Sequence, residues 1–202
     1  MKDSVQLENE YEHLKGDPLA VVRFFEKNKD DIELLDESQM SVRHFKLTLY
    51  GDYGISLAVN GNIHKAIPVL EELIPAFERE AEKYDRELET SAYYEKMLWA
   101  FGCSLHEAKR YQEAQRIFDK LVKYYPDNTK YKKWFVTAKA NRLSAARQSL
   151  WVACFAFIVI DFLFNKDMGE AMKNLFWITA VIILFVTLSL ELYIYLIRKK
   201  YS

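Results

Sequence analysis

The sequence has little of what crosslinks a chain or holds a metal. Its 202 residues include only two cysteines, one in the charged part of the chain and one in an apolar run, so we expect no disulfide, which fits a reducing cytoplasm. None of the four histidines has another at a helical spacing of three or four residues, and neither cysteine has a second ligand nearby. We therefore predict neither a metal site nor a cofactor.

Motifs of catalysis are also lacking. The sequence has no glycine-rich loop that could cradle a phosphate and no serine in a nucleophile elbow. Two carboxylate-rich stretches, 30–37 and 78–89, are interpreted as solvated faces of helices rather than as acid–base pairs. The sequence thus predicts a protein that is not an enzyme.

Strand patterns and an apolar leader are missing as well. Residues 1–16 form a polar N-terminal segment without the apolar core of a cleaved secretory signal. From residue 17 onward apolar residues recur at helical spacing, so we predict an all-α fold. Breakers divide the charged part into helices that begin near residues 18, 41, 64, 92, 112 and 129. We expect the third of these to continue through residue 89, with Pro75 bending or dividing it.

Two long apolar runs, 149–164 and 175–197, are the most distinctive feature of the chain. The second has 23 residues and one charge, so as a helix it reaches roughly 34 Å and can cross a bilayer alone. The first has 16 residues and spans a bilayer only with residues borrowed from the preceding helix. We predict a hairpin over 148–202, with spans at about 148–164 and 175–197.

Positive residues set the expected orientation of this hairpin. Six Lys and Arg residues precede the first span between residues 130 and 147, and three follow the second, at 198–200. This distribution favours both termini in the cytoplasm. We predict an integral membrane protein with two spans, in the cell's inner or plasma membrane.

Charge is divided along the chain, although the net value is −1. Residues 1–95 hold 11 basic and 21 acidic residues, a net of −10, whereas residues 96–147 hold 12 and 4, a net of +8. The basic part next to the membrane is expected either to contact anionic lipid headgroups or merely to signal topology. Nucleic acid is not an expected partner, because the basic stretch lacks a recognisable binding fold.

An internal repeat lies in the charged part. The 34 residues 95–128 resemble a tetratricopeptide repeat, and the nine matching positions are Leu98, Phe101, Gly102, Leu105, Tyr111, Ala114, Phe118, Leu121 and Pro126. An earlier unit, at about 47–80, carries Gly54, Gly61 and Ala66 in the same relative places, but Glu78 stands where proline would end it. We therefore expect a cytosolic helical-repeat domain over 17–147, with a capping and connecting helix at 129–147. Glycine and proline are absent from 129–165, so this helix should continue into the first span.

The resemblance to this family implies a concave groove that binds a peptide or a partner helix. The customary groove positions fall on Thr48, Gly51, Ile55 and Ala58 in the earlier unit, on Lys96, Trp99, Cys103 and His106 in the later one, and on Lys130 and Lys133 in the next helix. Such a surface, apolar on one side and basic on the other, suits an amphipathic or acidic peptide. In the alternative, Trp99 and Cys103 are buried by the capping helix.

Two acidic residues within the predicted spans are candidates for intramembrane packing or gating. Asp161 is close to the outer end of its span, whereas Glu191 is deeper and could pair with Arg147 or with a neighbouring subunit. Two functions follow from these observations. The first is a membrane-anchored scaffold that recruits a protein or peptide partner, and the alternative is an effector whose hairpin forms a homo-oligomer that makes a pore or disrupts the membrane.

Overall fold

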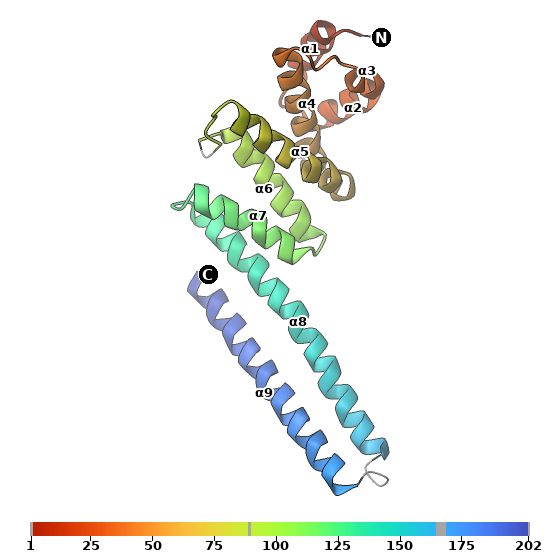
Figure 1. The fold of residues 1–202 in the computed structure, drawn as a ribbon, viewed down its shortest axis with the longest axis vertical. Coiled ribbons are helices and arrows are strands. Elements are labelled where there is room, and N and C mark those ends of the chain that lie inside the picture. Colours follow the sequence, from red (N-terminus) through yellow and green to blue (C-terminus); the bar gives the residue numbers. More distant parts are fainter. Residues whose placement is uncertain (1, 89, 165–168, 202) are drawn as a thin grey trace. The chain divides into compact units, whose positions relative to one another are not determined.

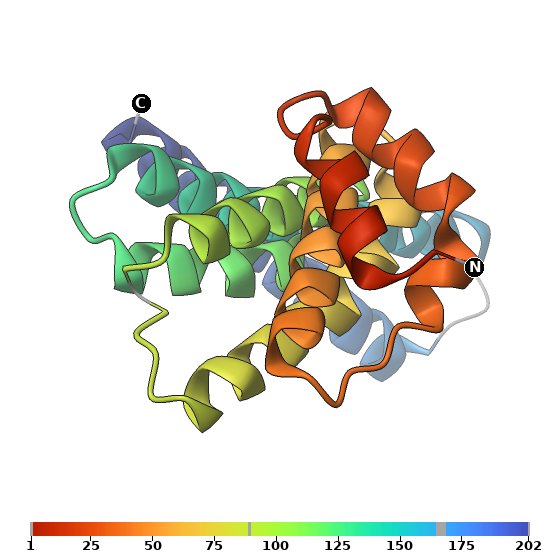
Figure 2. The ribbon, with the colours of Figure 1, turned by 90° about the horizontal axis from the view of Figure 1, so that it is seen from above.

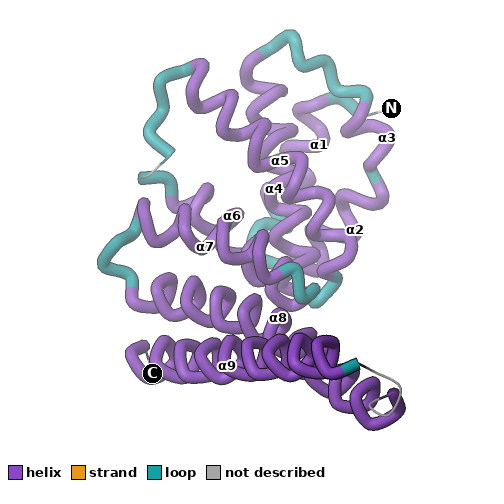
Figure 3. The backbone as a smooth tube through the Cα atoms, turned by 60° about the horizontal axis from the view of Figure 1, so that its bottom comes forward, coloured by secondary structure: helices purple, strands orange, loops and turns teal. Residues whose placement is uncertain are grey.

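The chain is all-α, as predicted. The computed structural model describes residues 2–88, 90–164 and 169–201, and these contain helices and no strand (Figures 1 and 3). The helices are α1 (Ser4–Glu12), α2 (Pro18–Lys27), α3 (Lys29–Glu33), α4 (Met40–Val59), α5 (Ile63–Lys83), α6 (Ala92–Glu107), α7 (Tyr111–Tyr124), α8 (Thr129–Phe164) and α9 (Glu170–Tyr201). They divide into two compact units, Met1–Tyr131 and Lys132–Ser202.

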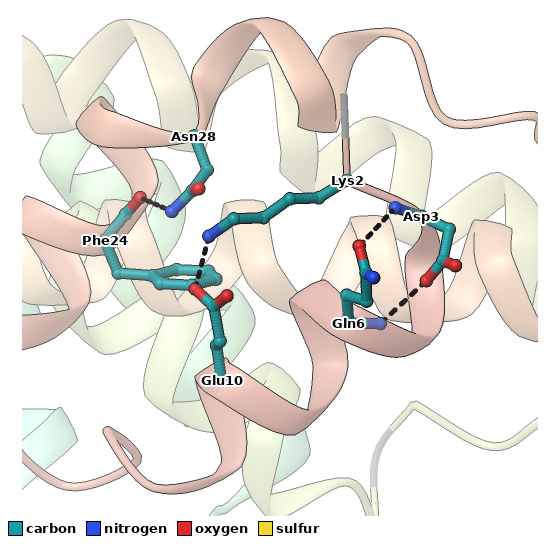
Figure 4. Close-up of polar contacts among 6 residues, drawn as sticks. All are labelled: Lys2, Asp3, Gln6, Glu10, Phe24 and Asn28. Carbon is teal, nitrogen blue, oxygen red and sulfur yellow. Dashed lines mark hydrogen bonds and ion pairs between the residues drawn. The ribbon is translucent and has the colours of Figure 1, made fainter.

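Helix α1 lies in the segment that was expected only to be polar. Asp3 starts it with a capping box, in which its side chain accepts from the backbone of Gln6 and the Gln6 side chain accepts from the backbone of Asp3 (Figure 4). Only Leu7 and Tyr11 of this helix are buried. Two buried positions in nine residues give too weak a pattern for the sequence to predict the helix.

Helix α2 begins where the sequence predicted. Asp17 accepts hydrogen bonds from the backbone amides of Leu19 and Ala20, and Pro18 occupies the first helical position, where no amide donor is needed. The helix ends at Lys27, and the Asn28 side chain donates to the carbonyl of Phe24 there (Figure 4). Figure 2 shows α1 beside α2 and α4.

Two helical hairpins, α4–α5 and α6–α7, have the same turn. After α4, Gly61 has a φ of +74°, and the amides of Gly61 and Asn62 donate to the carbonyls of Ala58 and Leu57. After α6, 48 positions later, Lys109 has a φ of +62°, and residues 109 and 110 repeat both hydrogen bonds with His106 and Leu105. Each turn is a Schellman motif, which satisfies the last carbonyls of a helix.

The packing inside the hairpins repeats with the same offset. A Cβ added to Gly54 would lie 2.8 Å from the side chain of Leu70, and one added to Gly102 would lie 2.8 Å from the ring of Phe118. The pairs that are buried in both hairpins include Gly54 and Gly102, Leu57 and Leu105, Ala66 and Ala114, Leu70 and Phe118, and Leu73 and Leu121. The two hairpins are therefore equivalent in their turns and in these buried positions.

Helix α5 is shorter than expected at its C-terminal end. It stops at Lys83 rather than residue 89, because Asp85 adopts a φ of +50° and the amide of Arg86 donates to Ala81, which again forms a Schellman motif. Pro75 lies inside this single helix without dividing it. Glu78, which replaces the expected proline, accepts hydrogen bonds from Tyr94 of α6 and, at 2.7 Å, from Lys120 of α7.

The second unit contains most of α8 and all of α9, and both helices are long and apolar enough to cross a membrane. Helix α8 continues without interruption from Thr129 to Phe164, as the absence of glycine and proline predicted. Only 6% of the apolar window in α8 and 11% of that in α9 are buried. A core helix of a water-soluble protein would bury far more of its apolar surface.

Candidate functional site

The four groove candidates on α6 lie on one face of that helix, because their spacings are three, four and three residues. Lys96 is exposed, whereas Trp99, Cys103 and His106 are half-buried. No described hydrogen bond or ion pair engages the Lys96 ammonium, which leaves it available to an anionic group.

Trp99, at the centre of this face, packs against the chain's own residues. The ammonium of Lys130 lies 3.8 Å from the centroid of the Trp99 ring, and the rings of Tyr131 and Phe118 lie 5.5 and 5.9 Å away. Tyr131 is fixed in turn by the hydrogen bond that its hydroxyl donates to Glu95. The first turn of α8 thus covers part of the surface that the sequence assigned to a ligand.

Burial disfavours the charged forms of the other two groups on this face. It raises the pKa of the Cys103 thiol to about 11, with Glu107 adding to the shift and Lys130 opposing it. Burial also lowers the pKa of His106, whose ring meets Tyr111 edge to face at 5.2 Å. A protonated thiol is a poor nucleophile and a poor metal ligand. Among the described residues, no group of three His, Cys, Asp or Glu side chains could hold a metal ion.

The groove candidates of the first hairpin are partly covered by Tyr93 of α6. Its hydroxyl donates to the carbonyl of Thr48 at 2.7 Å, and a Cβ at Gly51 would overlap that hydroxyl. Ile55 lines a small cleft of about 210 Å³ that also reaches Lys96. Lys133 belongs to the second unit, where it is exposed.

The sequence did not reveal a cleft of about 780 Å³ in the first unit, which lies among α2, α3, α4 and α5. Its aromatic wall contains Phe25, which stacks on Tyr53 at 3.9 Å and meets Tyr50 edge to face at 4.8 Å. Burial raises the pKa of Tyr50, and nearby carboxylates add to that shift. The rim consists mostly of salt-bridged side chains, including Lys65 with Glu26 at 2.8 Å. This cleft depends on how α2 packs against α4 and α4 against α5, which no local pattern encodes.

In the second unit, Glu191 is paired within the chain. Its carboxylate accepts a hydrogen bond from Arg147 at 2.8 Å, which was one of the two pairings expected from the sequence. Nearby on α9, Thr187 is fully buried, and its hydroxyl donates to the carbonyl of Ile183. This hydrogen bond within α9 satisfies a polar group that would otherwise be costly in lipid. The side chain of Asp161 lies outside the described residues.

No family model, curated protein or solved structure matches this chain in the comparisons. The resemblance to tetratricopeptide repeats therefore stays a prediction that depends on the residues quoted above. What the structure adds is the equivalence of the two hairpins, in their turns and in their buried positions.

Proposed function

We propose that this protein is a membrane-anchored adaptor whose helical-repeat unit binds a protein or peptide partner at the cytoplasmic face of a membrane. The observation that supports this proposal most directly is the continuity of α8. Its first turn contributes Tyr131 to the packing around Trp99, and the same helix goes on to the exposed apolar residues that end at Phe164. A helical-repeat unit and a membrane anchor then share one element.

The anchor is inferred from the exposed apolar surface of α8 and α9. Side chains such as Phe155, Ile158, Ile182 and Phe185 are each more than half exposed in the isolated chain. Contact with water at so many large apolar residues is unfavourable by about 25 cal/mol per Å², and lipid removes that penalty. Positive residues at both ends of the hairpin favour a cytoplasmic location for both termini.

The partner is inferred from the chemistry of the α6 face and of the cleft beside it. Lys96 is exposed and lines the cleft of about 210 Å³ together with the apolar side chain of Ile55. An ammonium next to an apolar surface fits an amphipathic, acidic peptide better than a basic one. Repeat proteins of the resembled family bind such segments along their concave faces.

Site-specific photocrosslinking in intact membranes tests the adaptor function. A photoreactive residue at position 96 is compared with one at position 123, because Lys123 is also a basic, exposed residue but lies on α7, away from the cleft. We expect a distinct protein to crosslink from position 96 and not from position 123. A photoreactive residue at position 55, which lines the same cleft, should capture that protein in lower yield when Lys96 is changed to Glu. Equal yields at both positions would contradict the proposed function.

The same experiment separates this function from that of an oligomerising effector. Crosslinks only between copies of this chain, together with ion leakage from vesicles that contain it, would favour the effector. Glu191 pairs with Arg147 of the same chain, so its carboxylate is already engaged and does not have to bind a neighbouring subunit.

A further inference from the structure

Helix α1 is attached to the first unit by two of its own side chains. Leu7 and Tyr11 are 0% and 1% exposed, whereas its other residues are exposed or half-buried. The Tyr11 ring meets Phe24 at 5.9 Å and Phe45 at 6.1 Å, and its hydroxyl donates to Asp52. We call the buried place that Leu7 and Tyr11 occupy, where Phe24, Phe45 and Asp52 contact Tyr11, the α1 seat.

The charged groups of this segment do not add to the attachment. Lys2 pairs with Glu10 (Figure 4) and Lys15 pairs with Glu12, so both ion pairs stay within the N-terminal segment. Among the described residues, no ion pair joins α1 to another helix. The connection to α2 is short and contains Gly16 at a φ of +98°. The attachment of α1 therefore depends on Leu7 and Tyr11.

The surface beside the α1 seat is larger than α1 itself covers. The cleft of about 210 Å³ is lined by Tyr11 and Asp52 of the seat and also by Ile55, Tyr93 and Lys96. Of the charged groups that line this cleft, Lys15 pairs with Glu12, Asp17 caps α2 and Asp52 accepts from Tyr11. Lys96 is exposed and has no described partner, so it is the charged group in this cleft that is available to an acidic residue.

We propose that the α1 seat is the docking site for a helix of a partner protein, which replaces α1 and is bound by the same chemistry. The partner helix carries an aliphatic residue and, four residues later, a tyrosine, which fill the places of Leu7 and Tyr11. Its outer face is acidic, as that of α1 is at Glu8 and Glu10, and an acidic residue beside the tyrosine meets Lys96. This inference deepens the proposed adaptor function and rests on it.

Competition between α1 and a partner has a measurable consequence. Because α1 is part of the same chain, it occupies the seat at a high effective concentration, and a partner binds only to molecules in which α1 has left. Substitutions that weaken the attachment of α1 should therefore tighten the binding of a free helix. The expected factor is the one by which α1 lowers the apparent affinity of the wild-type chain for that helix.

The test uses the full chain in lipid nanodiscs and a fluorescent peptide with the sequence of residues 2–15 as the probe. The Leu7→Ala/Tyr11→Ala double variant empties the seat without changing its walls. We expect the peptide to bind this variant at least tenfold more tightly than the wild-type chain, and a peptide with alanine in place of its tyrosine to bind neither. Equal binding of the peptide to both chains, or no binding to a variant with an unchanged circular dichroism spectrum, would overturn the proposal.

Hydrogen exchange on the wild-type chain gives an independent result if the double variant does not fold. Amides of α1 should exchange at least tenfold faster than those of α4, because α1 opens without unfolding the unit. Equal rates would refute the inference, as would crosslinks between position 11 of one copy and position 52 of another, which would assign the seat to a second copy.

The two proposals can fail separately. If the peptide binds to the seat but no partner crosslinks from position 96, the docking site is supported and the adaptor function is contradicted. If a partner crosslinks but its crosslinking yield does not rise in the double variant, the adaptor function is supported and the docking site is contradicted.

Discussion

Gly102 allows α6 and α7 to approach closely, and replacing it with alanine should destabilise the protein. The new Cβ would lie 2.8 and 3.1 Å from two ring carbons of Phe118. That ring is 0% exposed, and Trp99 lies 5.9 Å from it, so it has little space to move. Overpacking of this kind typically costs about 1 to 3 kcal/mol, and the better helix propensity of alanine offsets about 0.5 to 1 kcal/mol. We expect Gly102→Ala to lower the free energy of unfolding by about 1 to 2 kcal/mol.

The equivalent glycine of the first hairpin provides a matched control. At Gly54 a Cβ would lie 2.8 and 2.9 Å from Cδ2 and Cγ of Leu70, an aliphatic side chain that can adjust about its two side-chain torsions, whereas a phenyl ring is rigid. Gly54→Ala should therefore cost less, about 0 to 1 kcal/mol. The comparison holds the chemistry of the substitution constant and changes only the side chain that it meets.

The assay is urea unfolding of the full chain in detergent micelles, followed by far-ultraviolet circular dichroism. Phe118→Leu alone should cost about 1 to 2 kcal/mol through lost packing, but it should relieve the clash in the Gly102→Ala background. The double variant should be about 1 kcal/mol more stable than the sum of the single changes implies. Strict additivity, or wild-type stability of Gly102→Ala, would refute the close approach.

Three further substitutions test other features. Lys109→Gly should stabilise the chain by about 0.5 to 1 kcal/mol, because the φ of +62° costs an L side chain more than glycine loses in entropy; a lower urea midpoint would contradict this. Glu191→Gln and Arg147→Gln, alone and together, should show a coupling of about 0.5 to 1.5 kcal/mol in detergent unfolding, and zero coupling would show that the ion pair contributes nothing. In a Cys154→Ser variant, alkylation of Cys103 should accelerate about tenfold per pH unit up to its pKa of about 11, because burial keeps the thiol protonated; a plateau near pH 9 would be inconsistent with that pKa.

The helices whose ends carry strong local signals were predictable. Asp17 and Pro18 start α2, and the turn at Gly61 separates α4 from α5, because capping groups and positive φ angles are properties of single residues. The end of α5 was not predictable, since the residue at positive φ there is Asp85 rather than glycine. The sequence pattern continues past that point, so the expected helix was too long.

The candidate site was predictable to a lesser degree. Spacing alone placed Lys96, Trp99, Cys103 and His106 on one face of α6, as observed. Whether that face is open depends on tertiary contacts, and Lys130 closes part of it by lying 3.8 Å above the Trp99 ring. The contacts that seat α1 were missed for the same reason, since they depend on how α1, α2 and α4 pack together.

The common turn of the two hairpins has a consequence for engineering. Because the hydrogen bonds after α4 and after α6 recur at a constant offset of 48 residues, the hairpin is a module with a defined beginning and end. The second hairpin packs against the first through contacts of α6 with α4 and α5. A duplicated copy inserted between the hairpins would lengthen the array without requiring a new kind of interface, so that the number of modules becomes a variable that can be designed.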